Sequence, residues 1–175
     1  MESSHAFSAI DVVFDEANLI ADAGLVEVVG LAEAVGLAGL VTDRVRITGA
    51  DNAAGANPGA KVMSLVAGMA AGADSISDLD RLRIGAMDVA FTGIRAPSTL
   101  GTFLRSFTHG HVRQVESVHR ELLVRLAGAT PLLPGADQVA FLDLDSTHRQ
   151  VYGYCKQGAA VGRLKPGNHA FEAFY

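Results

Sequence analysis

Residues 139–147 read Val-Ala-Phe-Leu-Asp-Leu-Asp-Ser-Thr, and this stretch decides the fold class that the sequence predicts. The apolar run over residues 139–144 is typical of a strand, and residues 149–154 predict a second strand after a turn. No other part of the chain predicts strands clearly. Because the preceding residues have helical spacing, we expect an α+β protein, with a mainly helical N-terminal region ahead of the first strands of a sheet.

Two carboxylates lie on one face of the first predicted strand. Side chains alternate across a strand, so Asp143 and Asp145 share a face. Like charges at this distance repel each other, and a divalent cation relieves the repulsion. Hard oxygen ligands suit Mg²⁺. The motif therefore favours a magnesium site at Asp143 and Asp145; the alternative is a solvated strand end whose aspartates cap a turn.

Helical spacing dominates the rest of the chain. Residues 61–72 are apolar on nearly all sides, which predicts the central helix of a bundle. Residues 111–127 carry apolar side chains at steps of three and four, which predicts an amphipathic helix. Between them, Pro97 favours a helix start that Ser98 or Thr99 can cap. That helix carries an apolar stripe made of Leu100, Phe103, Leu104 and Phe107.

Residues 48–60 are rich in Gly, Ala, Asn and Pro, and they predict a connector between helices. A phosphate-binding P-loop does not fit this segment. No convincing strand precedes it, and Lys61 is not followed by Ser or Thr.

The composition bounds the class of protein. With 175 residues, of which 49% are hydrophobic, the chain can bury a core in one domain, or in one small domain and part of another. Its single cysteine, Cys155, cannot form an internal disulfide, which fits a reducing cytoplasm. The N-terminus lacks the cationic start of a signal peptide. The longest nearly apolar run, residues 62–73, is shorter than the roughly 20 residues that span a bilayer, so we expect no membrane partner.

Charge is distributed unevenly along the chain. Residues 1–80 hold 3 Lys/Arg against 12 Asp/Glu, whereas residues 81–175 hold 11 against 7, within a net charge of −5. Such asymmetry hints at a basic working surface. One reading is phosphate contact beside a helix-turn-helix-like pair; the other is a solvated face on which Arg120 and Arg125 pair with nearby glutamates. The basic residues concerned are Arg95, Arg105, Arg113, Arg120 and Arg125.

Three histidines lie close together in the same region. His109 and His111 occur in a His-Gly-His sequence, and His119 follows eight residues later. No cysteine or carboxylate cluster accompanies them, which argues against zinc. A helix start or a phosphate contact is the simpler interpretation.

Six segments, taken together, resemble a known family. They occur in an order and at spacings similar to those in the N-terminal half of bacterial insertion-sequence transposases of the DDE group 1 type. The resemblance covers residues 14–162, and no single segment carries it alone. The segments are Phe-Asp-Glu-Ala-Asn-Leu at 14–19, Ala-Gly-Met-Ala-Ala-Gly-Ala-Asp-Ser-Ile at 67–76, Arg-Ala-Pro-Ser-Thr-Leu-Gly-Thr-Phe-Leu-Arg at 95–105, Gly-His-Val-Arg-Gln at 110–114, Leu-Asp-Leu-Asp-Ser-Thr at 142–147 and Tyr-Gly-Tyr-Cys-Lys-Gln-Gly-Ala at 152–159.

The resemblance implies a domain plan and a set of site residues. Residues 1–130 would form a helical DNA-binding region, and residues 138–162 would begin an RNase H-like catalytic domain. Residues 163–175 depart from the family pattern, as an aberrant tail without strand-like alternation. Asp145 would be the first catalytic acid and a Mg²⁺ ligand, with Asp143 as the runner-up. The residues expected to contact DNA are Arg95, Ser98, Thr99, Arg105 and Arg113.

The implied function is that of a truncated DDE transposase. In its intact form it would bind transposon ends and carry out Mg²⁺-dependent cleavage and transfer of DNA strands, whereas this chain alone is expected to be inactive. The expected partners are DNA and a second copy or the full-length transposase, in the cytoplasm at the nucleoid.

Two alternatives remain. The first is a non-catalytic DNA-binding or dimerising fragment that inhibits transposition. The second, more remote, is an Asp-x-Asp-x-Thr phosphatase that uses Asp143 as nucleophile and Asp145 as acid/base. Chain order disfavours the phosphatase, because its motif should open the catalytic domain and only 28 residues follow Thr147.

Overall fold

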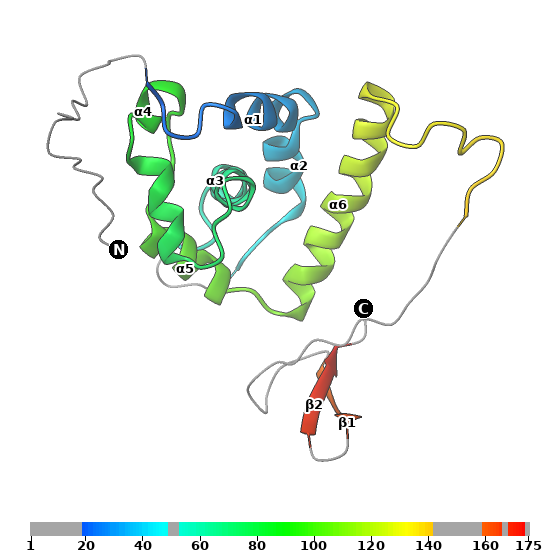
Figure 1. Cartoon of the computed structure of the whole chain (residues 1–175). Coiled ribbons are helices and arrows are strands. Elements are labelled where there is room, and N and C mark those ends of the chain that lie inside the picture. Colours follow the sequence, from blue (N-terminus) through cyan, green and yellow to red (C-terminus); the bar gives the residue numbers. More distant parts are fainter. Residues whose placement is uncertain (1–18, 49–52, 142–158, 166–167, 174–175) are drawn as a thin grey trace, which may run out of the picture.

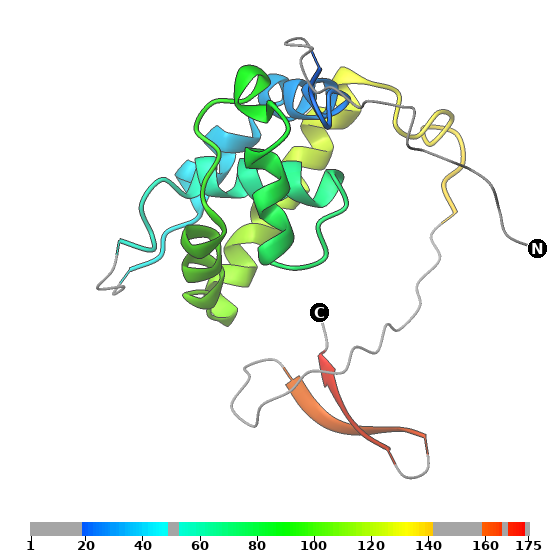
Figure 2. The same cartoon turned by 60° about the vertical axis from the view of Figure 1, so that its left-hand side comes forward.

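The computed structural model describes residues 19–48, 53–141, 159–165 and 168–173, and residues 19–141 form a helical unit (Figure 1, Figure 2). Outside the C-terminal strands, 61% of the described residues are helical. In chain order the helices are α1 (Leu25–Ala34), α2 (Leu37–Arg44), α3 (Pro58–Ala70), the 3-10 helix η2 (Ser77–Arg83), α4 (Met87–Ala90), α5 (Pro97–Arg105) and α6 (His109–Ala129).

Helix α3 lies at the centre, as the apolar run over residues 61–72 predicted. Figure 1 looks down its axis, with α1 above it, α5 below it, and α2 and then α6 to its right. Pro58 occupies the first turn, where its fixed φ favours a helix start and its missing N–H costs nothing. Gly59, Ala67 and Gly68 are buried, and their small side chains let neighbouring elements approach the helix closely.

Two hydrophobic clusters flank α3. One joins α2 to α6 and contains five buried residues: Leu37, Leu40, Val41, Val45 and Val118. The other joins α1, α3, η2 and α4 through Leu25, Ala67, Leu82 and Met87. On α5, Leu100 and Phe103 are completely buried, whereas Leu104 of the predicted apolar stripe is 40% exposed.

Helix α6 is tied to the α1–α2 region by arginine side chains. Arg44 donates to the Ser117 carbonyl oxygen at 2.9 Å and pairs with Glu121 at 3.3 Å. Arg125 donates to the Val35 carbonyl oxygen at 3.2 Å. The predicted pairs within α6 also form, Arg120 with Glu116 and Arg125 with Glu121, both at 3.3 Å. All are solvent-accessible, so each contributes about 0.2–1 kcal/mol at most.

The entry to η2 is organised by one carboxylate. Asp78 Oδ2 accepts hydrogen bonds from the backbone N–H and the hydroxyl of Ser75, both at 2.8 Å, and from the Asp74 N–H at 3.2 Å. These bonds, led by that from the Ser75 hydroxyl, lower the pKa of Asp78 below its usual value of 3.8.

Replacing Asp78 with Ala should therefore lower the melting temperature at neutral pH, and the difference from the wild type should shrink in acid. A carboxyl whose folded pKa is depressed stabilises the fold above its unfolded pKa and loses that contribution as pH falls through the folded value. Thermal melts between pH 7 and pH 2.5 measure this, with Asp88→Ala at another exposed aspartate as the control. A difference that stays constant with pH would contradict the ionic role.

The main correction to the sequence interpretation concerns the predicted RNase H-like strands, which the described residues do not form. Residues 139–141 are described and form no strand, while Val139 is 64% and Phe141 96% exposed; residues 142–154 lie outside the described part. A strand needs a neighbour to pair its backbone and cover its apolar face, and no described strand pairs with residues 139–141. The expected α+β class with an RNase H-like sheet is therefore wrong for the chain as described.

The strands that the structure does describe lie further on. Strands β1 (Ala159–Lys165) and β2 (Asn168–Ala173) form an antiparallel two-stranded hairpin, with Val161 opposite Phe171. Most of this hairpin falls in residues 163–175, for which the sequence predicted no strand. That expectation was also wrong.

No single helix among the described residues is long and apolar enough to cross a membrane. Helices α1 and α2 together meet the length and composition criteria, but they are bent by 54° relative to each other.

Candidate nucleic-acid interface

The predicted catalytic and metal-binding residues, Asp143 and Asp145, lie outside the described residues. Within the described part of the chain, no group of three or more His, Cys, Asp or Glu side chains could hold a metal ion. The site that can be built from the structure is therefore the basic surface of the helical unit.

The predicted DNA contacts lie on α5, on the start of α6 and on the segment before α5. Ser98, Thr99 and Arg105 are exposed on α5, and Arg113 is exposed near the start of α6. Arg95 precedes α5 and is partly buried. Pro97 begins α5 as predicted, but the N-cap is Ala96 and no side chain caps this helix, so the predicted cap at Ser98 or Thr99 was wrong.

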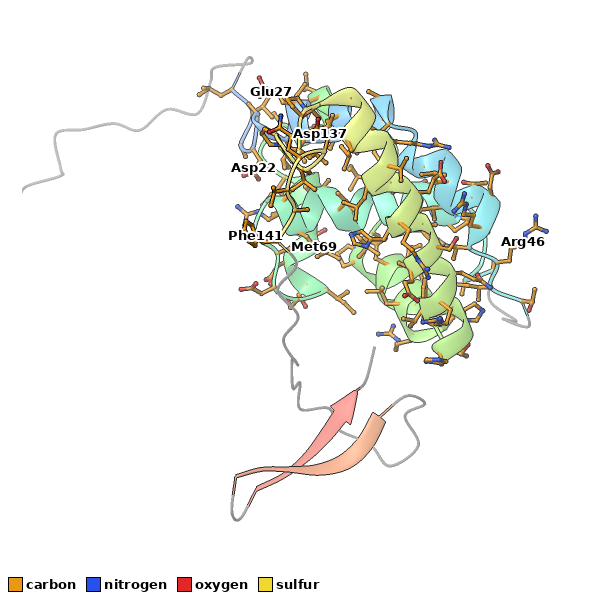
Figure 3. The ribbon with its side chains drawn as sticks, turned by 90° about the vertical axis from the view of Figure 1, so that its right-hand side faces the viewer. Asp22, Glu27, Arg46, Met69, Asp137 and Phe141 are labelled. Atoms are coloured by element: carbon orange, nitrogen blue, oxygen red, sulfur yellow. The ribbon has the colours of Figure 1, made fainter. Side chains whose placement is uncertain are left out.

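Three arginines lie on or beside the two helices that meet at the α5–α6 turn. Arg105 is the last residue of α5, and α6 begins only four residues later. The backbone N–H of Arg46, in the segment after α2, donates to the Gln114 Oε1 atom of α6 at 2.8 Å. This bond brings Arg46 beside the helix that carries Arg113. Figure 3 shows the Arg46 side chain projecting away from the helices, on the side opposite Asp22 and Glu27.

The arginines differ in whether a carboxylate already neutralises them. Arg113 pairs with Glu116 at 2.7 Å, and Arg120 shares that glutamate. Arg46 and Arg105 form no ion pair with any described carboxylate. They are therefore the more available contacts for an external anion.

One of the three histidines, His111, has a structural role at the start of α6. The Thr108 backbone N–H donates to His111 Nδ1 at 2.9 Å, and the His111 ring packs against Phe107 with 5.8 Å between ring centroids. His111 thus completes a capping box, the helix-start role that the sequence favoured over zinc.

Sequence reasoning missed two basic residues. Arg46 lies far from the 95–125 set in the chain, and only the contact with Gln114 places it there. The sequence placed Lys61 at the start of the predicted central helix and gave it no site role, yet it is 5% exposed and lies on the buried side of α3. A charged residue inside an otherwise apolar helix was the signal that could have identified it.

The surroundings of Lys61 are unusual for a lysine. Its Nζ donates to the Ala54 carbonyl oxygen at 2.7 Å and lies 5.3 Å from the centroid of the Phe103 ring. Burial, and then the charge of Arg95, lower the pKa of Lys61 below its usual value. The Arg95 Nε atom is itself buried, with no hydrogen-bond partner among the described residues.

The helical unit thus offers two basic features: exposed arginines around the α5–α6 turn, and a buried lysine with its arginine neighbour beside the start of α5. Both can attract phosphate groups. No family model, no curated protein and no solved structure matches this chain.

Proposed function

We propose that the helical unit is the DNA-binding part of an insertion-sequence transposase. The observation that carries the proposal is the set of exposed arginines on or beside α5 and α6, Arg46, Arg105 and Arg113, two of them without a described carboxylate partner. The resemblance of residues 14–162 to the transposase family supports the same reading. A surface of this kind contacts phosphates and positions DNA, rather than reading bases.

Binding of this kind has a characteristic dependence on salt. Each phosphate neutralised by a basic side chain releases condensed counterions, so the logarithm of the binding constant falls with the logarithm of salt concentration by about 0.9 per contact. Exposed arginines such as Arg46 and Arg105 therefore contribute to DNA affinity mainly at low ionic strength.

Strand cleavage and transfer would belong to the intact transposase. There a Mg²⁺ ion would supply activation of the attacking water and stabilisation of charge on the phosphate. Asp145, with Asp143 as the runner-up, is proposed to ligate it; both lie outside the described residues. The role of the helical unit would be to hold the transposon end.

The alternative is a fragment that pairs with another copy, or with the full-length transposase, and inhibits it. One observation favours a protein partner. Helix α6 leaves Val112, Val115 and Leu123 between 37% and 46% exposed, at intervals that place them along one side of the helix. Such a stripe suits helix-to-helix contact, and it is compatible with DNA binding by the arginines.

The DNA proposal predicts the behaviour of a double variant, Arg46→Ala with Arg105→Ala. Its affinity for duplex DNA at low salt should fall about tenfold, and its salt slope should become shallower by about 2, because two phosphate contacts are lost. Fluorescence anisotropy across a salt series, on duplexes with terminal repeats of the family type and on scrambled duplexes, measures both quantities.

A matched control is Arg81→Ala with Arg83→Ala, which removes the same charge from two exposed arginines that pair with Asp22 and Asp80. This control should bind DNA like the wild type. Equal weakening in both double variants would mean that net charge alone matters, and absence of binding by the wild type at low salt would refute the proposal.

A further inference from the structure

Lys61 and Arg95 form a pair of like charges without a counter-charge. Lys61 is 5% exposed, and the charge of Arg95 acts on it. Neither residue forms an ion pair with a described carboxylate; Glu33 lines a cavity together with Arg95 but lies beyond ion-pair distance. Charges withdrawn from water are normally paired, because an unpaired one is costly. The junction of α3 and α5 therefore has an excess of positive charge that an anion would relieve.

A pocket of about 280 Å³ opens beside this lysine. It is lined by Lys61, Ser98, Thr99 and Thr102, together with Ala53 and Ala54. The Ser98 and Thr99 hydroxyls donate to no described group, whereas Thr102 donates to the Ser98 carbonyl oxygen at 2.9 Å. A water molecule takes up about 30 Å³ in the liquid, so the pocket has room for a tetrahedral oxyanion and some of its waters.

Residues with hydrogen-bond donors line the pocket from two elements. Lys61 has three N–H donors; one bonds to Ala54 at 2.7 Å and a second makes a long contact to Ala53 at 3.4 Å. The N-terminus of α5 has no side-chain cap, so its first free backbone N–H groups add partial positive charge at Ser98 and Thr99. Charge, hydroxyls and backbone donors together match the oxygens of a phosphate group.

We propose that this pocket is a phosphate-binding subsite formed by Lys61, Ser98 and Thr99. It deepens the proposed function, on which the identity of the phosphate as a DNA backbone group rests. Ser98, Thr102 and Arg105 are spaced four and three residues apart, so the pocket and Arg105 share one side of α5. A strand that contacts Arg105 can therefore continue over the pocket.

The first arm of the test uses inorganic phosphate with the full chain. Titration at constant ionic strength, with chloride as the reference, should give saturable NMR shifts of the Ser98 and Thr99 amides. The shifts should be lost in Lys61→Met and in Ser98→Ala with Thr99→Val, and kept in the control Thr130→Val at the far end of α6. Because Lys61 also holds the 53–54 segment, its variant is compared only if its circular dichroism matches the wild type; the Ser98/Thr99 variant changes exposed side chains and keeps the test decisive.

The second arm uses duplex DNA and distinguishes the source of the phosphate. The Ser98/Thr99 variant should bind DNA with a salt slope shallower by about 1, equivalent to one lost phosphate contact, while Thr130→Val should not. Phosphate-induced shifts without any change in DNA binding would support the subsite but assign it to free phosphate. DNA binding that depends on Arg46 and Arg105, but with no effect in either arm for the pocket variants, would overturn the subsite and leave the proposed function standing.

Discussion

Replacing Phe103 with Ala is expected to lower the free energy of unfolding by about 3–5 kcal/mol. The side chain is completely buried, and its ring makes an edge-to-face contact with Phe107 at 5.0 Å between centroids. Lys61 Nζ lies 5.3 Å from the ring centroid, so the substitution also removes a cation–π contact and leaves a cavity beside a buried charge. Against a total stability of about 5–15 kcal/mol for a typical domain, this loss is large.

Urea denaturation followed by circular dichroism measures the effect. Leu104→Ala is the matched control, because it removes an apolar side chain from the next position of the same helix, where the residue is 40% exposed. The control should cost much less, since its side chain leaves little water-excluded space behind. Similar losses in the two variants would mean that α5 does not bury the Phe103 face.

The contrast between Phe103 and Leu104 shows what the sequence could and could not settle. Spacing placed Leu100, Phe103 and Leu104 on one apolar stripe of a helix that begins at Pro97, and that helix is present. Which edge of the stripe is buried depends on where α3 and η2 lie, and no local pattern contains that information. The predicted stripe therefore identified the buried side of the helix but included Leu104, which is exposed.

Helices with strong local signals were predicted well, for a physical reason. The amphipathic repeat of residues 111–127 and the apolar run of residues 61–72 act within a few turns of the chain. The strand prediction at residues 139–144 depended instead on partners elsewhere in the sequence. A strand-like pattern of apolar side chains shows only that a segment could join a sheet. Residues 139–141 have no described strand beside them, and Val139 and Phe141 stay exposed.

The candidate interface also divides into residues that local sequence patterns identify and a residue that only a long-range contact identifies. Ser98, Thr99, Arg105 and Arg113 could be nominated because they lie on two consecutive predicted helices. Arg46 belongs with them only through a hydrogen bond to Gln114 across 68 positions in the chain. Long-range contacts of this kind are where one sequence, read alone, gives no guide.

Replacing Gly59 with Ala is the second substitution with a large expected effect, a loss of about 1–3 kcal/mol from overpacking. Gly59 lies in the first turn of α3, where that helix meets α2. A Cβ atom there would overlap the Ala38 carbonyl oxygen and would lie 2.6 Å from Thr42 Oγ1. Because the first obstacle is backbone, a rotamer change cannot relieve the overlap, and α2 would have to move away from α3.

A second glycine provides the opposite expectation from the same kind of change. Gly39 lies inside α2, and a Cβ atom there would meet nothing within 4 Å, so Gly39→Ala should raise stability by up to about 1 kcal/mol through helix propensity. Denaturation midpoints should thus rise in the order Gly59→Ala, wild type, Gly39→Ala. If Gly59→Ala were as stable as Gly39→Ala, the close approach of α2 to α3 would be wrong. The separation of α2 and α3 determines how tightly α3 covers the cluster that contains Leu37, Leu40 and Val41. Equal stability of the two variants would therefore also contradict the tight packing of that cluster.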